Sequence, residues 1–255
     1  MKKTVAAILA VLALLLQGCA GNDIAITTAE ETAGITTAAV TDEVSTEAPE
    51  PEDTRIAAVF SIPGGFYEKS AKLELSLPES APEGAYITYT TDNSEPDGNS
   101  KKYTSPITVG KSDVTVVRAA CFDSDGGYIG CIRTATYIKT APDRYSTLVI
   151  SLVTEEKNLY GDTGIISNPR NSGKEWERPC HVEIFTPEGE RIVSQDAGIR
   201  IFGGSSRGLQ QKSFRLIARK DGYYDEMKYN GKGSFEYPFF DGRTADVRRS
   251  VIHFP

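Results

Sequence analysis

Short runs in which apolar and polar residues alternate constrain the fold of this chain more than any other feature. Residues 72–77 (KLELSL) place leucine at every second position, and residues 86–90 (YITYT) are rich in aromatic and β-branched side chains. A third run follows at 114–120, and turn-forming residues fill 92–98 and 123–127. A period of two is typical of strands that bury one face. We therefore expect residues 56–140 to form a small antiparallel β-sandwich.

The second half of the chain carries the same kind of signal. Apolar runs of strand length occupy 147–153, 180–185, 197–202 and 211–218. No long window shows the 3.6-residue period of an amphipathic helix. The fold class is therefore expected to be mainly β, with a second, strand-rich domain over 145–255.

The N-terminus indicates export. Lys2 and Lys3 precede an uninterrupted apolar run over 5–16, which is typical of a signal peptide and shorter than the roughly 20 residues that span a membrane. Residues 16–19 (LQGC) resemble the lipobox of bacterial lipoproteins, which implies removal of residues 1–18 and acylation of Cys19. Two or more acyl chains anchor a protein stably, so we expect an exported protein held on the outer face of the cell membrane. An ordinary secretory signal with an incidental cysteine is the alternative.

An acidic stretch follows the expected lipidation site. Residues 20–54 hold nine Asp or Glu and no Lys, Arg or aromatic residue. Such a segment buries too little apolar surface to offset its chain entropy, so we expect a disordered tether over 19–55. The formal net charge is −7, and the part from residue 55 onward is neutral overall. No domain is broadly basic, which argues against a nucleic-acid partner.

Three cysteines remain beyond Cys19. Cys121 and Cys131 flank the last turn of the first domain, and in a regular hairpin they would face each other on one side of the sheet. A disulfide, which an exported compartment permits, and a pair of reduced thiols remain equally open. Cys180 is expected to be a buried small apolar residue. The two histidines form no metal-ligand spacing with these cysteines, so no metal site is expected.

Four segments of the first domain form a recognisable series of motifs: 65–67 (GFY), 87–96 (ITYTTDNSEP), 103–107 (YTSPI) and 116–119 (VVRA). Together they resemble the chitobiase/β-hexosaminidase C-terminal domain family. Asn93 stands where that family usually has glycine, and asparagine tolerates the left-handed turn conformation. The resemblance implies an immunoglobulin-like accessory sandwich that lacks a catalytic centre of its own.

The hairpin over 198–216 carries the strongest chemical signal. Its loop contains three glycines and two serines, and Lys212 lies just inside the expected second strand. A glycine-rich loop lets backbone N–H groups approach an anion, and a neighbouring lysine can meet phosphate oxygens, as in protein kinases. The alternative is an ordinary glycine-rich loop with a solvent-facing lysine.

Residues 159–165, 182–185, 198–207 and 211–215 together resemble the front half of the CotH family, spore-coat and surface proteins with an atypical α+β kinase-like fold. Its most specific block, here RIFGGSSR followed by KSFR, is intact. The resemblance implies an ATP-dependent protein phosphotransferase lineage in which Lys212 contacts a nucleotide phosphate. For the arginines, a structural role that holds the hairpin to a neighbouring loop is equally open. The further candidate contacts are Arg207, Arg200, Ser205, Ser206, Gly203 and Gly204.

The chain ends where CotH-type domains continue into the segment that supplies their acidic, metal-binding residues. We therefore expect a shortened domain without phosphoryl-transfer activity, with Phe235, Phe239 and Phe240 exposed. ATP and Mg²⁺ are expected as cofactors only of a complete domain. The alternative is a non-catalytic surface protein that binds or scaffolds a surface protein or a polysaccharide.

Overall fold

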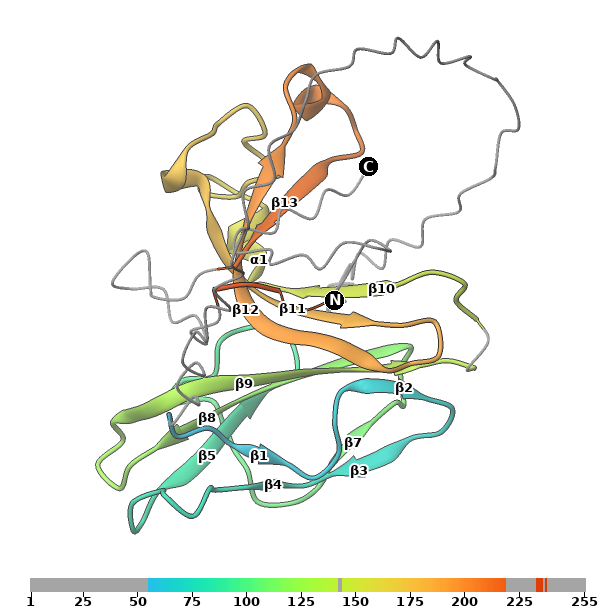
Figure 1. The fold of residues 1–255 in the computed structure, drawn as a ribbon. Helices are drawn as coiled ribbons and strands as arrows, with labels where there is room; N and C mark the ends of the chain where they lie inside the picture. The colour runs from blue at the N-terminus through green and yellow to red at the C-terminus, as the bar shows by residue number, and fades with distance from the viewer. Residues whose placement is uncertain (1–54, 142–143, 219–232, 236, 238–255) are drawn as a thin grey trace, which may run out of the picture. The chain divides into compact units, whose positions relative to one another are not determined.

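The computed structural model describes residues 55–141, 144–218, 233–235 and 237, and strands dominate them (Figure 1). This confirms the mainly β fold class. Residues 1–54, which include Cys19, lie outside the described part. The strands of the first domain are β1 (Val59–Phe60), β2 (Gly65–Tyr67), β3 (Ala71–Leu73), β4 (Leu75–Ser76), β5 (Tyr86–Thr90), β6 (Lys101–Lys102), β7 (Ile107–Val109), β8 (Val114–Phe122) and β9 (Tyr128–Lys139).

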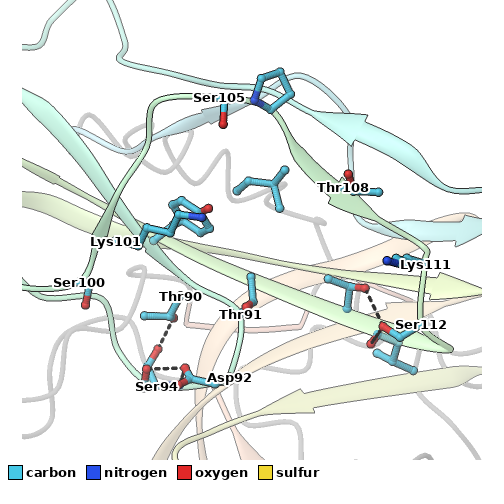
Figure 2. Close-up of a pocket in the computed structure, with 15 residues that line it drawn as sticks. Thr90, Thr91, Asp92, Ser94, Ser100, Lys101, Ser105, Thr108, Lys111 and Ser112 are labelled. Atoms are coloured by element: carbon cyan, nitrogen blue, oxygen red, sulfur yellow. Dashed lines mark hydrogen bonds between the residues drawn. The ribbon is translucent and has the colours of Figure 1, made fainter.

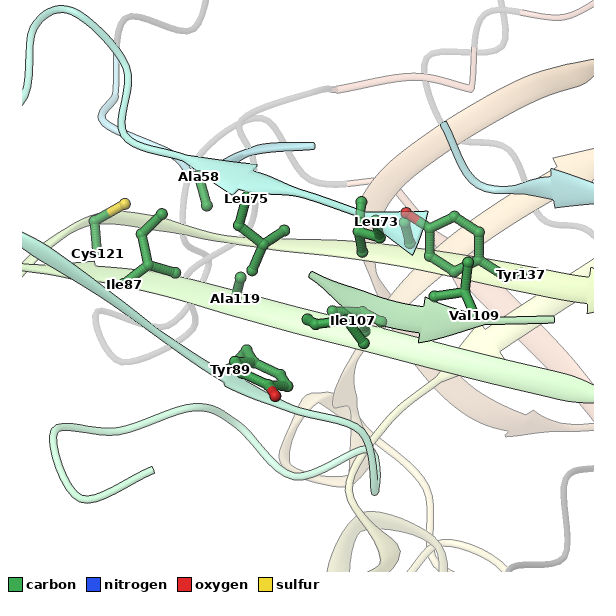
Figure 3. Packing of buried hydrophobic residues seen from close by; sticks show 12 residues of the cluster. Ala58, Leu73, Leu75, Ile87, Tyr89, Ile107, Val109, Ala119, Cys121 and Tyr137 are labelled. Atoms are coloured by element: carbon green, nitrogen blue, oxygen red, sulfur yellow. The ribbon is translucent and has the colours of Figure 1, made fainter. Parts of the chain in front are cut away.

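A five-stranded sheet in the order β2-β9-β8-β5-β6 forms one layer of this domain, and the pairs β1–β4 and β3–β7 accompany it. The predicted alternation is confirmed at the leucines: Leu73 and Leu75 are buried, whereas Lys72 and Glu74 are exposed. Figure 3 shows both leucines within the core. The buried residues of this core are Ala58, Leu73, Leu75, Ile87, Tyr89, Ile107, Val109, Val117, Ala119, Cys121, Ala135 and Tyr137.

Two details differ from the sequence-based expectation. The run over 72–77 is split, because β3 pairs with β7 while β4 pairs with β1. In addition, β2 pairs with β9 in parallel, with Gly65 opposite Tyr137. The wholly antiparallel sandwich is therefore wrong at this edge of the sheet, and the alternation could not reveal it, because strand direction leaves the side-chain period unchanged.

The β8–β9 hairpin contains an irregularity that separates the two cysteines. Ala119 lies opposite Arg133, and continuation of that register would set Cys121 opposite Cys131. The register instead shifts between Ala119 and Cys121, so that Cys121 lies opposite Ile129. The expected face-to-face pairing is therefore wrong, because two extra residues on β9 between these pairs shift the register toward the turn. Both cysteines are buried, and no disulfide joins them in this structure.

The second domain is one antiparallel sheet in the order β10-β11-β12-β13. Its only α-helix among the described residues spans four residues, in keeping with the absence of a helical period. Lys212 lies just before the last strand, rather than inside it. The elements are β10 (Val149–Val153), α1 (Glu156–Leu159), η1 (Lys174–Trp176), β11 (Arg178–Phe185), β12 (Arg191–Phe202), η2 (Ser205–Gly208) and β13 (Ser213–Ile217).

One face of this sheet carries an apolar core. Cys180 is 5% exposed and belongs to it, as predicted. Phe235 is completely buried in the same core, so its expected exposure is wrong, while Phe239 and Phe240 lie outside the described residues. The buried members are Ile165, Cys180, Val182, Ile184, Val193, Ala197, Ile199, Ile201, Leu216, Ala218 and Phe235.

The other face is polar and contacts β9. Glu183 is fully buried there and accepts hydrogen bonds from the Thr136 backbone N–H (2.6 Å) and from Arg191 Nη1 (3.0 Å). The hydroxyl groups of Thr136 and Ser151 lie 2.8 Å apart. Because side chains of a strand alternate between faces, His181 and Glu183 of β11 lie on this side with Ser194 and Asp196 of β12.

Candidate functional site

A cavity of about 480 Å³ lies beside the loop that joins β12 to β13. It is the place where the glycine-rich loop meets the segment before β11. Aromatic and cationic side chains share its wall with three glycines. The lining residues are Ile165, Asn171, Ser172, Gly173, Trp176, Arg200, Ile201, Phe202, Gly203, Gly204, Arg207 and Arg215.

Arg200 enters the cavity wall while bound to a buried carboxylate. Its Nε donates to Glu177 Oε2 at 2.8 Å, and its Nη2 donates to the same oxygen. Glu177 is fully buried, and a side chain at Gly198 would overlap its carboxylate. The structural role weighed for Arg200 therefore has a definite partner, and glycine at 198 leaves the room that the ion pair needs.

Arg207 ties the glycine-rich loop to the segment before β11. Its Nε donates to Gly203 O at 2.5 Å, and its Nη1 donates to Asn171 O at 2.8 Å and to Pro169 O at 3.4 Å. These acceptors are neutral carbonyls, so these contacts orient the Arg207 guanidinium without neutralising its positive charge. Arg207 thus holds two loops together and still presents a cationic surface to the cavity.

Lys212, Ser205 and Ser206 are not among the residues that line this cavity. The Lys212 ammonium donates to Arg207 O at 2.9 Å and to Leu209 O, so it caps carbonyls of its own loop. Ser205 and Ser206 are exposed in η2. The structure therefore gathers Arg200, Arg207, Gly203 and Gly204 from the sequence-predicted set and leaves the other three outside the wall.

Arg215 is a site residue that the sequence analysis did not single out. It lies opposite Arg200 in the β12–β13 register, and its guanidinium carbon stands 4.4 Å from the centre of the Phe202 ring. Its Nε is buried and has no hydrogen-bond partner among the described residues. The placement of Arg215 opposite Arg200 is set by the β12–β13 register, so no local pattern in the sequence indicated it.

Among the described residues, the charges around this cavity do not balance. Three guanidinium groups line it, and Glu177, paired with Arg200, is the carboxylate that the described part of the chain brings against them. A buried cationic group without a partner is costly, and guanidinium binds carboxylate or phosphate through its fork of donors. The arrangement is thus suited to an anionic ligand, with Trp176 and Phe202 as apolar walls.

A second, more open groove of about 1000 Å³ lies on the sandwich (Figure 2). Hydroxyl groups dominate its lining, and Lys101 and Lys111 are its cations. Lys101 also stands 5.4 Å from the centre of the Tyr89 ring. The labelled polar residues in the groove are Thr90, Thr91, Asp92, Ser94, Ser100, Ser105, Thr108 and Ser112.

The residues that carry the chitobiase-type resemblance build the turn at one end of this groove. Asn93 has a positive φ of 70°, the conformation expected of it. Asp92 Oδ1 accepts hydrogen bonds from the Ser94 N–H (3.1 Å) and hydroxyl (2.6 Å). Arg118 Nη1 donates to Asn93 O at 2.9 Å, and its Nη2 reaches Glu95 Oε1 at 3.3 Å. These contacts show that the motif shapes a turn.

Metal and membrane features can be addressed for the described residues. No group of three or more His, Cys, Asp or Glu side chains in that part of the chain is arranged to hold a metal ion. Within the same residues, no helix is long and apolar enough to cross a bilayer.

Comparison with known proteins places the first domain. Residues 62–128 match the family model of the chitobiase/beta-hexosaminidase C-terminal domain. This confirms the resemblance for the sandwich and covers β2 to the first residue of β9. No curated protein and no solved structure matches the chain.

Proposed function

We propose that this chain is a surface lipoprotein, anchored through Cys19, whose second domain binds a phosphate-bearing ligand in the arginine-lined cavity. The observation that carries the ligand class is the set of three arginines around one cavity, of which Arg200 alone has a carboxylate partner among the described residues. The anchor rests on the lipobox-like LQGC sequence and the acidic tether that follows it.

Arg215 supplies the strongest reason to expect an anion. Its Nε is removed from water without a hydrogen-bond partner in the described structure, and such a group loses its hydration without compensation. A phosphate oxygen would accept that hydrogen bond and offset the positive charge of Arg207 as well. Backbone at Gly203 and Gly204 can approach a ligand closely, because no side chain intervenes.

The CotH-like sequence blocks make a nucleoside triphosphate the first ligand to try. ATP carries both the phosphates that suit the arginines and an aromatic base that suits Trp176, whose ring lies in the wall. Under this proposal the domain belongs to the CotH kinase-like lineage. Lys212 then stabilises the conformation of the loop through its hydrogen bonds to two loop carbonyls.

The test is calorimetric titration of the full chain with ATP, with and without Mg²⁺, and with pyrophosphate. Charge-assisted hydrogen bonds contribute about 1.5–3 kcal/mol, so we expect Arg215→Gln to weaken binding by roughly tenfold or more. Arg133→Gln, an exposed arginine of the sandwich, is the matched control and should bind like the wild type. No heat from any phosphate compound, or equal affinity in Arg215→Gln, would reject the proposal.

A non-catalytic role at the cell surface is the second candidate, and the groove on the sandwich favours it. Hydroxyl and ammonium groups at Thr91, Ser105 and Lys111 line the groove and can exchange hydrogen bonds with a polysaccharide. Retention of the chain on insoluble cell-wall polysaccharide, lost in a Lys101→Gln/Lys111→Gln double variant, would support this role. Passage of the wild type without retention would speak against it.

A further inference from the structure

Three side chains on the polar face of the second sheet form a serine–histidine–aspartate relay. His181 on β11 places Nδ1 2.7 Å from Asp196 Oδ1, and its Nε2 lies 3.4 Å from Ser194 Oγ. Both Ser194 and Asp196 belong to β12. The order of contacts is carboxylate, imidazole, hydroxyl, the order that activates a serine in acyl-transfer enzymes on unrelated folds.

The strand register explains why these residues meet. His181 lies directly opposite Asp196, and Glu183 lies directly opposite Ser194. Ser194 and Asp196 are two residues apart on one strand, so their side chains leave the same face. Ser194 is then a diagonal neighbour of His181, at a separation that an imidazole ring can bridge. The spacing in the sequence, histidine on one strand and Ser-x-Asp on the next, becomes a relay only through this register.

The contacts of His181 are those that a general base for a serine needs. A carboxylate oxygen accepts hydrogen bonds, so the tautomer with its hydrogen on Nδ1 would donate to Asp196. In that tautomer the Nε2 lone pair would accept a hydrogen bond from the Ser194 hydroxyl. A nucleophile–base separation somewhat longer than an ideal hydrogen bond is common before substrate binds.

The surroundings keep this arrangement intact. His181 is 7% exposed, and Asp196 retains 18% exposure of its side chain. Glu183, the nearest other carboxylate in the register, is already bound by Thr136 N–H and Arg191, so it does not compete for the imidazole. Ser194 is of intermediate burial, so part of this residue remains in contact with solvent.

We propose that Ser194 is a nucleophile toward small carboxylic esters, with His181 as its general base. Ser194 Oγ adds to the ester carbonyl carbon while its proton passes to His181 Nε2. The bond to the alcohol oxygen breaks, and the alcohol leaves with that proton. Water then attacks the acyl-serine by the same route, which releases the carboxylic acid and restores the serine. Asp196 is a positioning residue, because it acts through the histidine.

This activity uses none of the residues of the arginine-lined cavity, so it stands or falls separately from phosphate binding. The test treats the full chain with a fluorophosphonate probe, which reacts with activated serines, and maps the adduct by peptide mass spectrometry. We expect one adduct, on Ser194. Ser194→Ala and His181→Gln should lose it, and Asp196→Asn should label at least about tenfold more slowly, since the wrong tautomer is then stabilised.

Ser213→Ala, which removes a half-buried strand serine that lies opposite Phe202, is the control and should label like the wild type. Hydrolysis of p-nitrophenyl acetate by the wild type should follow the labelling across the variants. Absence of an adduct in the wild type, or an adduct that maps to another residue, overturns the proposal. Mapping in the wild type decides the outcome even where a variant fails to fold.

Discussion

Two glutamates with no exposed surface, Glu177 and Glu183, organise the polar face of the second sheet. Each is paired with an arginine, Arg200 and Arg191 respectively. Each also lies where glycine leaves room: a Cβ atom at Gly64 would stand 2.6 Å from Glu183 Oε1, and one at Gly198 would overlap Glu177. A buried ion pair adds little net stability, but removal of one partner is costly. These carboxylates are therefore places where single substitutions should have large effects.

Replacement of Glu183 by alanine should destabilise the protein strongly. The change leaves the Thr136 N–H and the Arg191 guanidinium without their acceptor in a buried setting, so we expect a loss of about 3 kcal/mol in the free energy of unfolding. Urea denaturation followed by circular dichroism measures it. The control is Glu190→Ala at an exposed position, which should stay within about 0.5 kcal/mol of the wild type. Equal stability of the two variants would contradict the role of Glu183.

The thiol of Cys121 should be inert in the folded protein. Burial raises the pKa of Cys121 to about 11, and the neighbouring Cys131 adds to the shift. Because the thiolate is the reactive form, only about one molecule in a thousand is reactive near pH 8. Labelling with N-ethylmaleimide under reducing conditions, read by peptide mass spectrometry, should leave Cys121 unmodified until denaturant is added. Rapid labelling of the native protein would show that the site is open or its pKa ordinary.

Among the elements, the β8–β9 hairpin departs most from a regular ladder. Its register shifts beside Cys121, and near its turn Gly130 adopts a φ of 82°. At that point the Cys131 N–H donates to Ile56 O at 2.8 Å. The strand can accept the incoming chain at Ile56 because Gly130 carries no side chain.

Substitution of Gly130 by alanine should therefore disrupt this hairpin. An added Cβ atom would overlap the Ile56 carbonyl oxygen, and the left-handed conformation would add its own strain. We expect a loss of at least about 2 kcal/mol in the free energy of unfolding. Gly98→Ala is the matched control in the same domain, because its φ is ordinary and its nearest neighbour would lie 3.9 Å away. A Gly130→Ala protein as stable as this control would refute the steric argument.

The sequence predicted several of the strands of five or more residues well and the shortest ones poorly. Residues 86–90 were expected to form a strand and coincide with β5, and the runs that became β8, β10 and β11 were placed within a few residues. Of β12, only the second half (197–202) was expected. The two-residue strands β1 and β6 carry too few residues for a period to show. The bulge at Cys121 and the parallel β2–β9 pair depend on tertiary contacts, so no local pattern indicated them.

In the candidate sites too, features set by contiguous sequence were predicted, and features set by tertiary contacts were not. Glycines 203 and 204 and Arg207 were recognised because their loop is contiguous in the sequence. Arg215 and the Ser194–His181–Asp196 relay were not, because they form only when neighbouring strands settle into one register. Lys212 was expected to face a phosphate, yet its ammonium is turned onto carbonyls of its own loop. Side-chain direction just outside a strand cannot be read from the alternation that holds within it.

For the whole molecule, the family match covers only the sandwich, residues 62–128. The proposed location of the protein depends instead on the N-terminal sequence. If Cys19 carries acyl chains, they should hold the chain on a membrane, because two or more chains anchor stably where one is marginal. The acidic tether should then extend by self-repulsion and lift the folded part away from the bilayer.

Substitution of Cys19 by serine should therefore release the protein from membranes. The wild type expressed in a bacterial host should incorporate an alkyne-labelled fatty acid and enter the detergent phase of a Triton X-114 separation. Cys19→Ser should lose the fatty-acid label and move to the aqueous phase, since no other acylation site is expected. Cys121→Ser is the control, because that thiol is buried in the sandwich and its loss should leave partitioning unchanged. A Cys19→Ser protein that still carries fatty acid would mean that the anchor lies elsewhere, and the surface-lipoprotein proposal would fall.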